Sequence, residues 1–319
     1  MTRKAAIGML RAAALAAAFF VAGGAIPFVG ALVMIFSPAP VLGYAIGRPS
    51  PRLRTVGSIA AAAGLVGVAA GLMATLSYLL SFGLATAIVC YMIEKEYRFE
   101  TIILVAATAM VVAGTIGSLL VTGSPQALAK EIYDTLSSAM GRSADFYKLL
   151  GTDMKIASDT QKTLLNMTIR LVPAIIVLAA ASTILLNLIV VWRWLAPKER
   201  FKYPLFGDLA RWNAPEWLIW VLITAGFALF VPVTGVKTLA IDSFVCVAAV
   251  YFCQGLAIVS FYFRALSMPM AVRTVVYVIA MLQPIFAGLL CAVGIFDIWI
   301  DFRRLKPPSE KQSIFGDFF

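Results

Sequence analysis

Long apolar runs separated by short charged segments dominate the chain. Stretches without Asp, Glu, Lys or Arg span residues 12–47, 55–93, 101–129, 171–192, 217–236, 243–263 and 274–296. A helix needs about 20 residues to cross a bilayer, so each of the first two runs is long enough for two crossings. Residues 23–27 (Gly-Gly-Ala-Ile-Pro) and Gly71 offer the two turns. The pattern predicts an all-α polytopic membrane protein with about eight to nine transmembrane segments.

Composition strengthens this class and excludes several chemistries. Apolar residues make up 61% of the 319 residues and charged residues 13%, where a soluble domain has about 25% charged. The chain has no histidine, and its four cysteines lie singly within apolar runs, which speaks against histidine catalysis, zinc sites and disulfide frameworks. No nucleophile elbow, P-loop or dinucleotide motif occurs. We expect no enzymatic activity, no catalytic or metal-binding residues and no cofactor.

The distribution of basic residues predicts the orientation. Arg3, Lys4 and Arg11 precede the first apolar segment, which indicates a cytoplasmic N-terminus. The net charge of +10 favours contact with anionic lipid headgroups rather than with nucleic acid. The basic C-terminal residues fit this pattern only if one segment is re-entrant, so eight and nine crossings both stay open. An apolar stretch at residues 5–24 is interpreted as the first span and not as a cleaved signal peptide.

The polar stretch at 123–170 separates two predicted membrane bundles. Residues 1–122 are expected to form a five-segment bundle, 123–170 an extracytoplasmic amphipathic segment, 171–305 a four-segment bundle and 306–319 a polar tail. Ser124-Pro125 is a helix-start signal, and Leu128, Ile132 and Leu136 recur every four residues on one face. Such a helix either lies on the membrane surface or acts as a lid over a cavity between the spans.

Uncharged features inside the apolar runs are the first candidate site. Pro38 and Pro40 should break a helix near membrane depth and free backbone carbonyls, which is tolerated where they face protein or a cavity. Gln254 lies within a later run and is expected either to bond a neighbouring helix or to contact a ligand.

An aromatic and basic segment forms the second candidate site. Five of the six tryptophans surround residues 193–216, and the candidate partner residues there are Trp194, Arg200, Lys202 and Trp212. Indole rings favour the headgroup region, so the segment is either an interfacial anchor or a docking platform for a cytoplasmic or membrane protein.

The third candidate site is the end of the last apolar run. Asp297 and Asp301 are four residues apart and would share one face if the helix continued, with Arg304 close to that face. A carboxylate there would pair with a guanidinium and tie the last span to a neighbouring basic loop. The alternative is an ordinary helix end whose charges extend into the headgroups.

Several motifs together resemble a known family. They are residues 36–40 (Phe-Ser-Pro-Ala-Pro), 203–206 (Tyr-Pro-Leu-Phe), 254–256 (Gln-Gly-Leu) and 294–304 (Gly-Ile-Phe-Asp-Ile-Trp-Ile-Asp-Phe-Arg-Arg). In these the chain resembles the YybS-like family of bacterial multi-pass membrane proteins, whose function is undetermined. This likeness implies a location in the bacterial inner membrane. The N-terminal half is also distantly similar to the S-components of energy-coupling-factor transporters, which usually have six spans, fewer than this chain.

Two functions follow from these features. The first is capture or transport of a small molecule within the membrane, by a bundle that resembles an S-component. The alternative is a structural or regulatory partner in a membrane assembly, without transport.

Overall fold

The computed structural model describes residues 3–25, 29–46, 48, 50–149, 158–194 and 209–305, which are helical or in turns and contain no strand. The chain divides into two compact units, Met1–Leu205 and Phe206–Phe319. The predicted all-α class is confirmed. Residues 158–194, which the predicted organisation divides at 170, form one helix, α8 (Ser158–Trp194), of the first unit.

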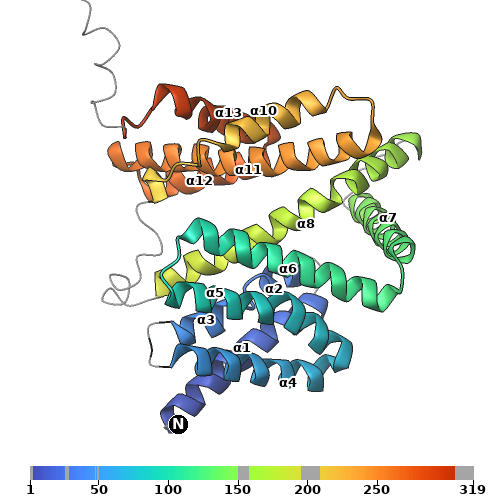
Figure 1. Ribbon diagram of the computed structural model, residues 1–319, viewed down its shortest axis with the longest axis vertical. Helices are drawn as coiled ribbons and strands as arrows, with labels where there is room; N and C mark the ends of the chain where they lie inside the picture. The colour runs from blue at the N-terminus through green and yellow to red at the C-terminus, as the bar shows by residue number, and fades with distance from the viewer. Residues whose placement is uncertain are drawn as a thin grey trace, which may run out of the picture. The chain divides into compact units, whose positions relative to one another are not determined.

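The first unit begins with an antiparallel pair. Helix α1 (Arg3–Ala25) is followed by α2 (Val29–Met34) and α3 (Ala39–Ala45), which return along it (Figure 1). The Ser37 hydroxyl donates to the carbonyl of Ala16 at 2.9 Å, and the Tyr44 hydroxyl donates to that of Ala5 at 2.6 Å. These two bonds set the register of the antiparallel pair, while residues 26 and 27 of the predicted turn lie outside the described residues.

A second reversal lies within the next long helical stretch. Helix α4 (Pro51–Tyr78) continues through the π-helical turn η1 (Leu79–Gly83) into α5 (Leu84–Glu94), and at Gly71 its backbone takes φ 86° and ψ 178°. The Thr75 hydroxyl reaches the carbonyl of Ala63 at 3.5 Å, and Arg52 pairs with Glu94 at 2.9 Å. Thr75 and Ala63 are separated by 12 positions in the sequence, and Arg52 and Glu94 by 42. A straight helix could not bring either pair together, so the chain folds back at Gly71.

Three more helices complete the described part of the first unit. They are α6 (Phe99–Thr122), α7 (Pro125–Leu149) and α8. Ser124 caps α7 as expected, since its hydroxyl accepts the amide of Ala127 at 3.1 Å. Helix α7 packs against both α6 and α8. The core lies where α1 meets α4, and its largest side chains are Phe20, Tyr78 and Phe82, with the Phe20 ring 5.3 Å from Tyr78 and 5.9 Å from Phe82 between centroids.

The second unit is built around one long helix. Its elements are the 3-10 turn η2 (Leu209–Arg211) and the helices α10 (Leu218–Ala228), α11 (Thr234–Ala265), α12 (Met270–Leu282) and α13 (Pro284–Ile300). Helix α11 packs against α13, α10 and η2. Gly255 on α11 and Gly294 on α13 let the backbones touch, because a Cβ at either position would overlap a carbonyl of the other helix.

The number of candidate membrane spans is smaller than predicted. Among the described residues five helices are long and apolar enough to cross, or up to six if the bent pair of α12 and α13 counts as one span. This count does not support eight to nine segments. Three features account for the lower count. Residues 51–94 count as one candidate despite the reversal at Gly71, α2 and α3 form only a short broken apolar helix, and a bend of 100° separates α12 from α13.

Candidate functional site

The end of α13 is the part of the predicted sites with the most connected polar geometry. The helix ends at Ile300, and Asp301 takes the left-handed conformation with φ 46°. The expected helical continuation to Arg304 is therefore wrong, and Arg304 lies exposed at a second left-handed position, φ 50°. The turn directs the neighbouring Arg303 back toward the helix, and Arg303, not Arg304, becomes the partner of the carboxylate.

Asp297 and Arg303 form a buried ion pair. Arg303 Nη2 lies 2.6 Å from Asp297 Oδ2, and the two side chains are 0% and 3% exposed respectively. Gln254 donates to the same carboxylate oxygen from α11 at 3.1 Å, and the amide of Phe302 donates to Oδ1 at 2.9 Å. Both carboxylate oxygens are thus hydrogen-bonded, as burial of a charge requires.

Arg303 and Gln254 also bind the segment that precedes α10. Arg303 Nη1 donates to the carbonyls of Ala210 at 2.8 Å and Trp212 at 3.0 Å, and Nη2 also bonds the side-chain oxygen of Asn213. Gln254 Oε1 accepts the amide of Ala214 at 3.1 Å. Residues 210–214, here called the pinned loop, are therefore fixed to α11 and α13 by side chains that lie 40 to 93 positions away.

This geometry positions the backbone and offers little scope for chemistry. The carboxylate and the guanidinium are closed off by protein, so neither can exchange a proton with an external substrate. Removal of either partner would leave an uncompensated buried charge, which typically costs about 3–5 kcal/mol. The network therefore makes the conformation of the pinned loop dependent on the end of α13.

Asp301 has a smaller part in the same turn. Its backbone amide closes α13 on the carbonyl of Asp297 at 3.0 Å, and its Oδ1 accepts the amide of Leu305 at 3.0 Å. The predicted tie to a neighbouring loop belongs to Asp297. Sequence reasoning placed the helix end too late, although Pro307 and Pro308 are a stop signal shortly beyond it.

The predicted helix break at Pro38 and Pro40 is present and buried. Pro38 ends the connection from α2 to α3, which is closed by turn hydrogen bonds, and Pro40 lies in the first turn of α3. Asn187 of α8 donates from Nδ2 to the freed carbonyl of Ile35 at 2.7 Å, and also to the carbonyl of Thr183 at 2.7 Å. The break thus faces protein. Asn187 was recognisable from the sequence as a buried polar residue but not as the partner of this break.

The predicted aromatic and basic segment is divided between the two units and partly lies outside the described residues. Trp194 ends α8 in the first unit and is 64% exposed. Trp212 belongs to the pinned loop in the second unit, where it packs on a core that includes Tyr251 and Ile219. Arg200 and Lys202 lie outside the described residues.

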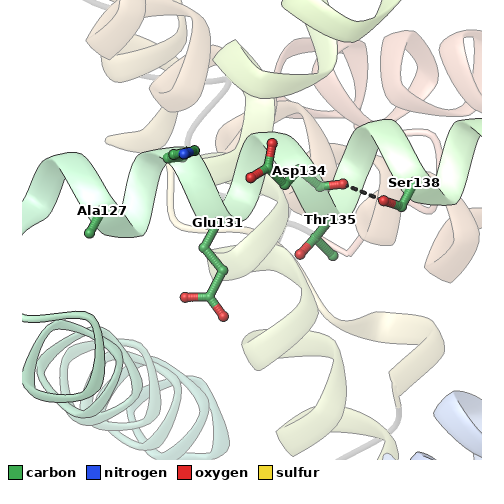
Figure 2. A pocket seen from close by; sticks show the side chains of 6 residues that line it. Ala127, Glu131, Asp134, Thr135 and Ser138 are labelled. Carbon is green, nitrogen blue, oxygen red and sulfur yellow. Dashed lines mark hydrogen bonds between the residues drawn. The ribbon is translucent and has the colours of Figure 1, made fainter.

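A hollow lies on the polar face of α7. The sequence predicted this helix and its apolar face but not the residues that line the hollow. Its volume is about 480 Å³, and the described lining residues are Ala127, Lys130, Glu131, Asp134, Thr135 and Ser138. Figure 2 shows these side chains along one face of α7, with Ser138 bonded to the carbonyl of Asp134 at 2.7 Å. The predicted apolar positions Leu128 and Ile132 are half-buried on the opposite side of the helix.

No cluster of three or more His, Cys, Asp or Glu that could hold a metal ion occurs in the described ranges. The four cysteines are unpaired thiols, and Cys291 donates to the carbonyl of Ala248 at 3.4 Å within the second unit. These thiols pack as small apolar side chains.

Comparison with known proteins gives a family and no activity. A family described as "Predicted membrane protein (DUF2232)" matches residues 14–298. No curated protein and no solved structure matches the chain. The match covers both units and agrees with the helical, multi-pass architecture, while the likenesses to YybS-like proteins and to S-components stay predictions. The chain belongs to the DUF2232 family of predicted membrane proteins.

Proposed function

We propose that the first unit captures a small polar molecule in the bacterial inner membrane, as a non-enzymatic binding or transport protein that resembles an S-component. The observation that carries the proposal is the hollow of about 480 Å³ on the polar face of α7. The hollow is an open groove along one helix, with exposed polar lining side chains, and its volume is large enough for a small molecule. The proposal gives α7 the role of the predicted lid.

The position of the hollow supports capture from outside the cytoplasm. One end of the first unit gathers the N-terminus of α1, the connection from α3 to α4, the end of α5, the start of α6 and the end of α8. Its basic residues are Arg3, Arg48, Arg52, Arg54, Lys95, Arg98 and Arg193. By the positive-inside rule this end, with the N-terminus, is cytoplasmic. Helix α7 follows the opposite end of α6, which is then extracytoplasmic.

The segment pattern of the first unit supports the likeness to S-components. Its membrane segments are α1, the broken α2–α3 pair, the two arms 51–70 and 72–94 on either side of Gly71, α6 and α8. We propose that each of these crosses the bilayer separately, because each arm of the hairpin has about the length that one crossing needs. The unit would then have the six spans usual in S-components, with the second unit as an addition.

The lining predicts the chemical class of the captured molecule. Lys130, Glu131 and Asp134 place one ammonium and two carboxylates along the hollow, beside the hydroxyls of Thr135 and Ser138. Such a surface favours a small polar molecule that carries a cationic group, alone or as a zwitterion. An apolar ligand would leave these charges without partners.

Co-purification tests this proposal. The full chain is purified in a mild detergent, and bound small molecules are extracted and identified by mass spectrometry. Wild type is compared with the double variant Glu131→Gln/Asp134→Asn, and with Glu96→Gln as a control for the loss of an exposed carboxylate at the basic end. A polar compound enriched in wild type and control but lost from the double variant supports capture. A preparation without any enriched compound, or equal retention by all three proteins, refutes it.

A second candidate function is supported by the pinned loop. A buried ion pair that fixes five residues gives the cytoplasmic or membrane surface of the second unit a defined shape, next to the exposed Trp217, which is 63% exposed. We propose on this basis a partner surface in a membrane assembly. A photo-cross-linker at position 217 tests this proposal, with recovery of a cross-linked partner compared between wild type and the double variant Arg200→Glu/Lys202→Glu. Unchanged recovery in the double variant would refute a contribution of the basic segment to partner binding.

A further inference from the structure

An aromatic ring with two arginines lies at the basic end of the first unit. Arg48 Cζ is 4.9 Å and Arg54 Cζ is 5.2 Å from the centroid of Tyr44, both within the distance of a cation–π contact. The ring itself is fixed, since Tyr44 is 6% exposed and its hydroxyl donates to the carbonyl of Ala5 at 2.6 Å. Arg54 Nη1 donates to the same hydroxyl at 3.3 Å.

This arrangement concentrates positive charge. Two guanidinium groups within about 5 Å of one ring centroid repel each other, and an anion that contacts both lowers this repulsion. At the same end Arg52 pairs with Glu94 at 2.9 Å and Arg98 with Glu100 at 3.4 Å. The side chain of Arg48 is exposed, and within the described part of the chain its recorded interaction is the one with the ring. It is therefore available to an anion.

An apolar surface adjoins the arginines along α4. Leu53 is 68% exposed, Val56 62% and Val68 91%, and they lie on a face of α4 that has no covering helix among the described residues. In a bilayer such a face contacts acyl chains. A phospholipid whose chains run along this face would bring its phosphate to the level of Leu53, beside Arg54.

From this juxtaposition we propose that Arg48 and Arg54 bind the phosphate of an anionic phospholipid, with Tyr44 as the platform that orients both guanidinium groups. Guanidinium forms paired hydrogen bonds with phosphate oxygens, and the shared ring reduces the side-chain freedom lost on binding. The apolar face favours a lipid over a free phosphate ion, because only a lipid buries both surfaces. The site does not depend on the capture of a small molecule at α7.

Native mass spectrometry of the full chain in a neutral detergent tests the site. The protein is titrated with phosphatidylglycerol and, separately, with phosphatidylcholine of the same acyl chains. Arg48→Gln and Arg54→Gln are compared with Arg98→Gln, which removes one positive charge from the same end. Inorganic phosphate is added in a further series as a competitor.

The site predicts preferential retention of phosphatidylglycerol and about tenfold weaker retention in Arg48→Gln and Arg54→Gln, as expected for loss of a charge-assisted bond. Arg98→Gln should retain the lipid as wild type does. Equal losses in all three variants, equal binding of both lipids, or displacement of the lipid by millimolar phosphate would each overturn the proposal. If Arg54→Gln fails to fold, Arg48→Gln decides, because the side chain of Arg48 is exposed and its contact with the described residues is the one with the ring.

Discussion

Conversion of Asp297 to asparagine should destabilise the second unit far more than the same change in an exposed ion pair. Asp297→Asn leaves Arg303 buried, with a side chain 0% exposed, and without its counter-ion. Breaking a buried pair costs about 3–5 kcal/mol. Glu94→Gln makes the same carboxylate-to-amide change in the pair with Arg52, where the side chains are 33% and 60% exposed, so it should cost less than about 1 kcal/mol.

The assay must report the second unit by itself, because two units need not unfold together. A background in which Cys291 is the sole cysteine serves this purpose, since its thiol is bonded to Ala248 inside that unit. Glu94→Gln lies in the first unit and is measured in a background in which Cys90, buried in α5, is the sole cysteine. Thermal scans with a thiol-reactive dye should shift down by about 10 °C or more for Asp297→Asn. A shift no larger than that of Glu94→Gln would refute the reasoning and leave Asp297 as an ordinary helix-end charge.

Two further predictions concern glycines and use thermal scans of the same kind. Gly294→Ala should cost roughly 1–3 kcal/mol, because its Cβ would overlap the carbonyl of Tyr251, whereas Gly288→Ala, with no neighbour within 4 Å, should be neutral or stabilising; equal shifts would contradict the close helix contact. Gly71→Ala should cost about 1–2 kcal/mol because φ is +86° there, while Gly64→Ala in open helical surroundings should not destabilise; a neutral Gly71→Ala would argue against the reversal.

Features set by a few neighbouring residues could be predicted from the sequence. The reversal at Gly71, the cap at Ser124 and the break at Pro38 each follow from local backbone preferences, and the described residues contain all three. Glycine at Gly71 permits the positive φ, and proline at Pro38 cannot continue the hydrogen-bond ladder of a helix.

Features that depend on distant contacts could not be predicted. The partner of Asp297 was expected on a continued helix, where Arg304 would lie close to it. Because Asp301 takes the left-handed conformation, the chain turns away from the helix axis, and Arg303 pairs with Asp297 instead. Arg303 donates to carbonyls that lie 93 and 91 positions away in the sequence, in the pinned loop. No regular spacing in the sequence links these positions, so the contacts could not be predicted from it. The predicted number of eight to nine spans is not supported for a related reason. The length of an apolar run alone does not distinguish a straight membrane-crossing helix from a bent or broken one.

The two units satisfy their buried polar groups by different means, and the difference bears on what each unit does. In the first unit neutral side chains supply the donors at the helix break: Asn187 donates to the freed carbonyl of Ile35, and Ser37, within the break, donates to the carbonyl of Ala16 on α1. In the second unit a guanidinium supplies donors to two loop carbonyls, an amide oxygen and a carboxylate at once, which no neutral side chain can do. A charge is costly to bury, so its use is reasonable where an irregular segment leaves several acceptors together and its shape must be kept. A fixed loop of this kind suits a surface that another protein recognises, whereas the neutral ties of the first unit suit a bundle that encloses or admits a small molecule.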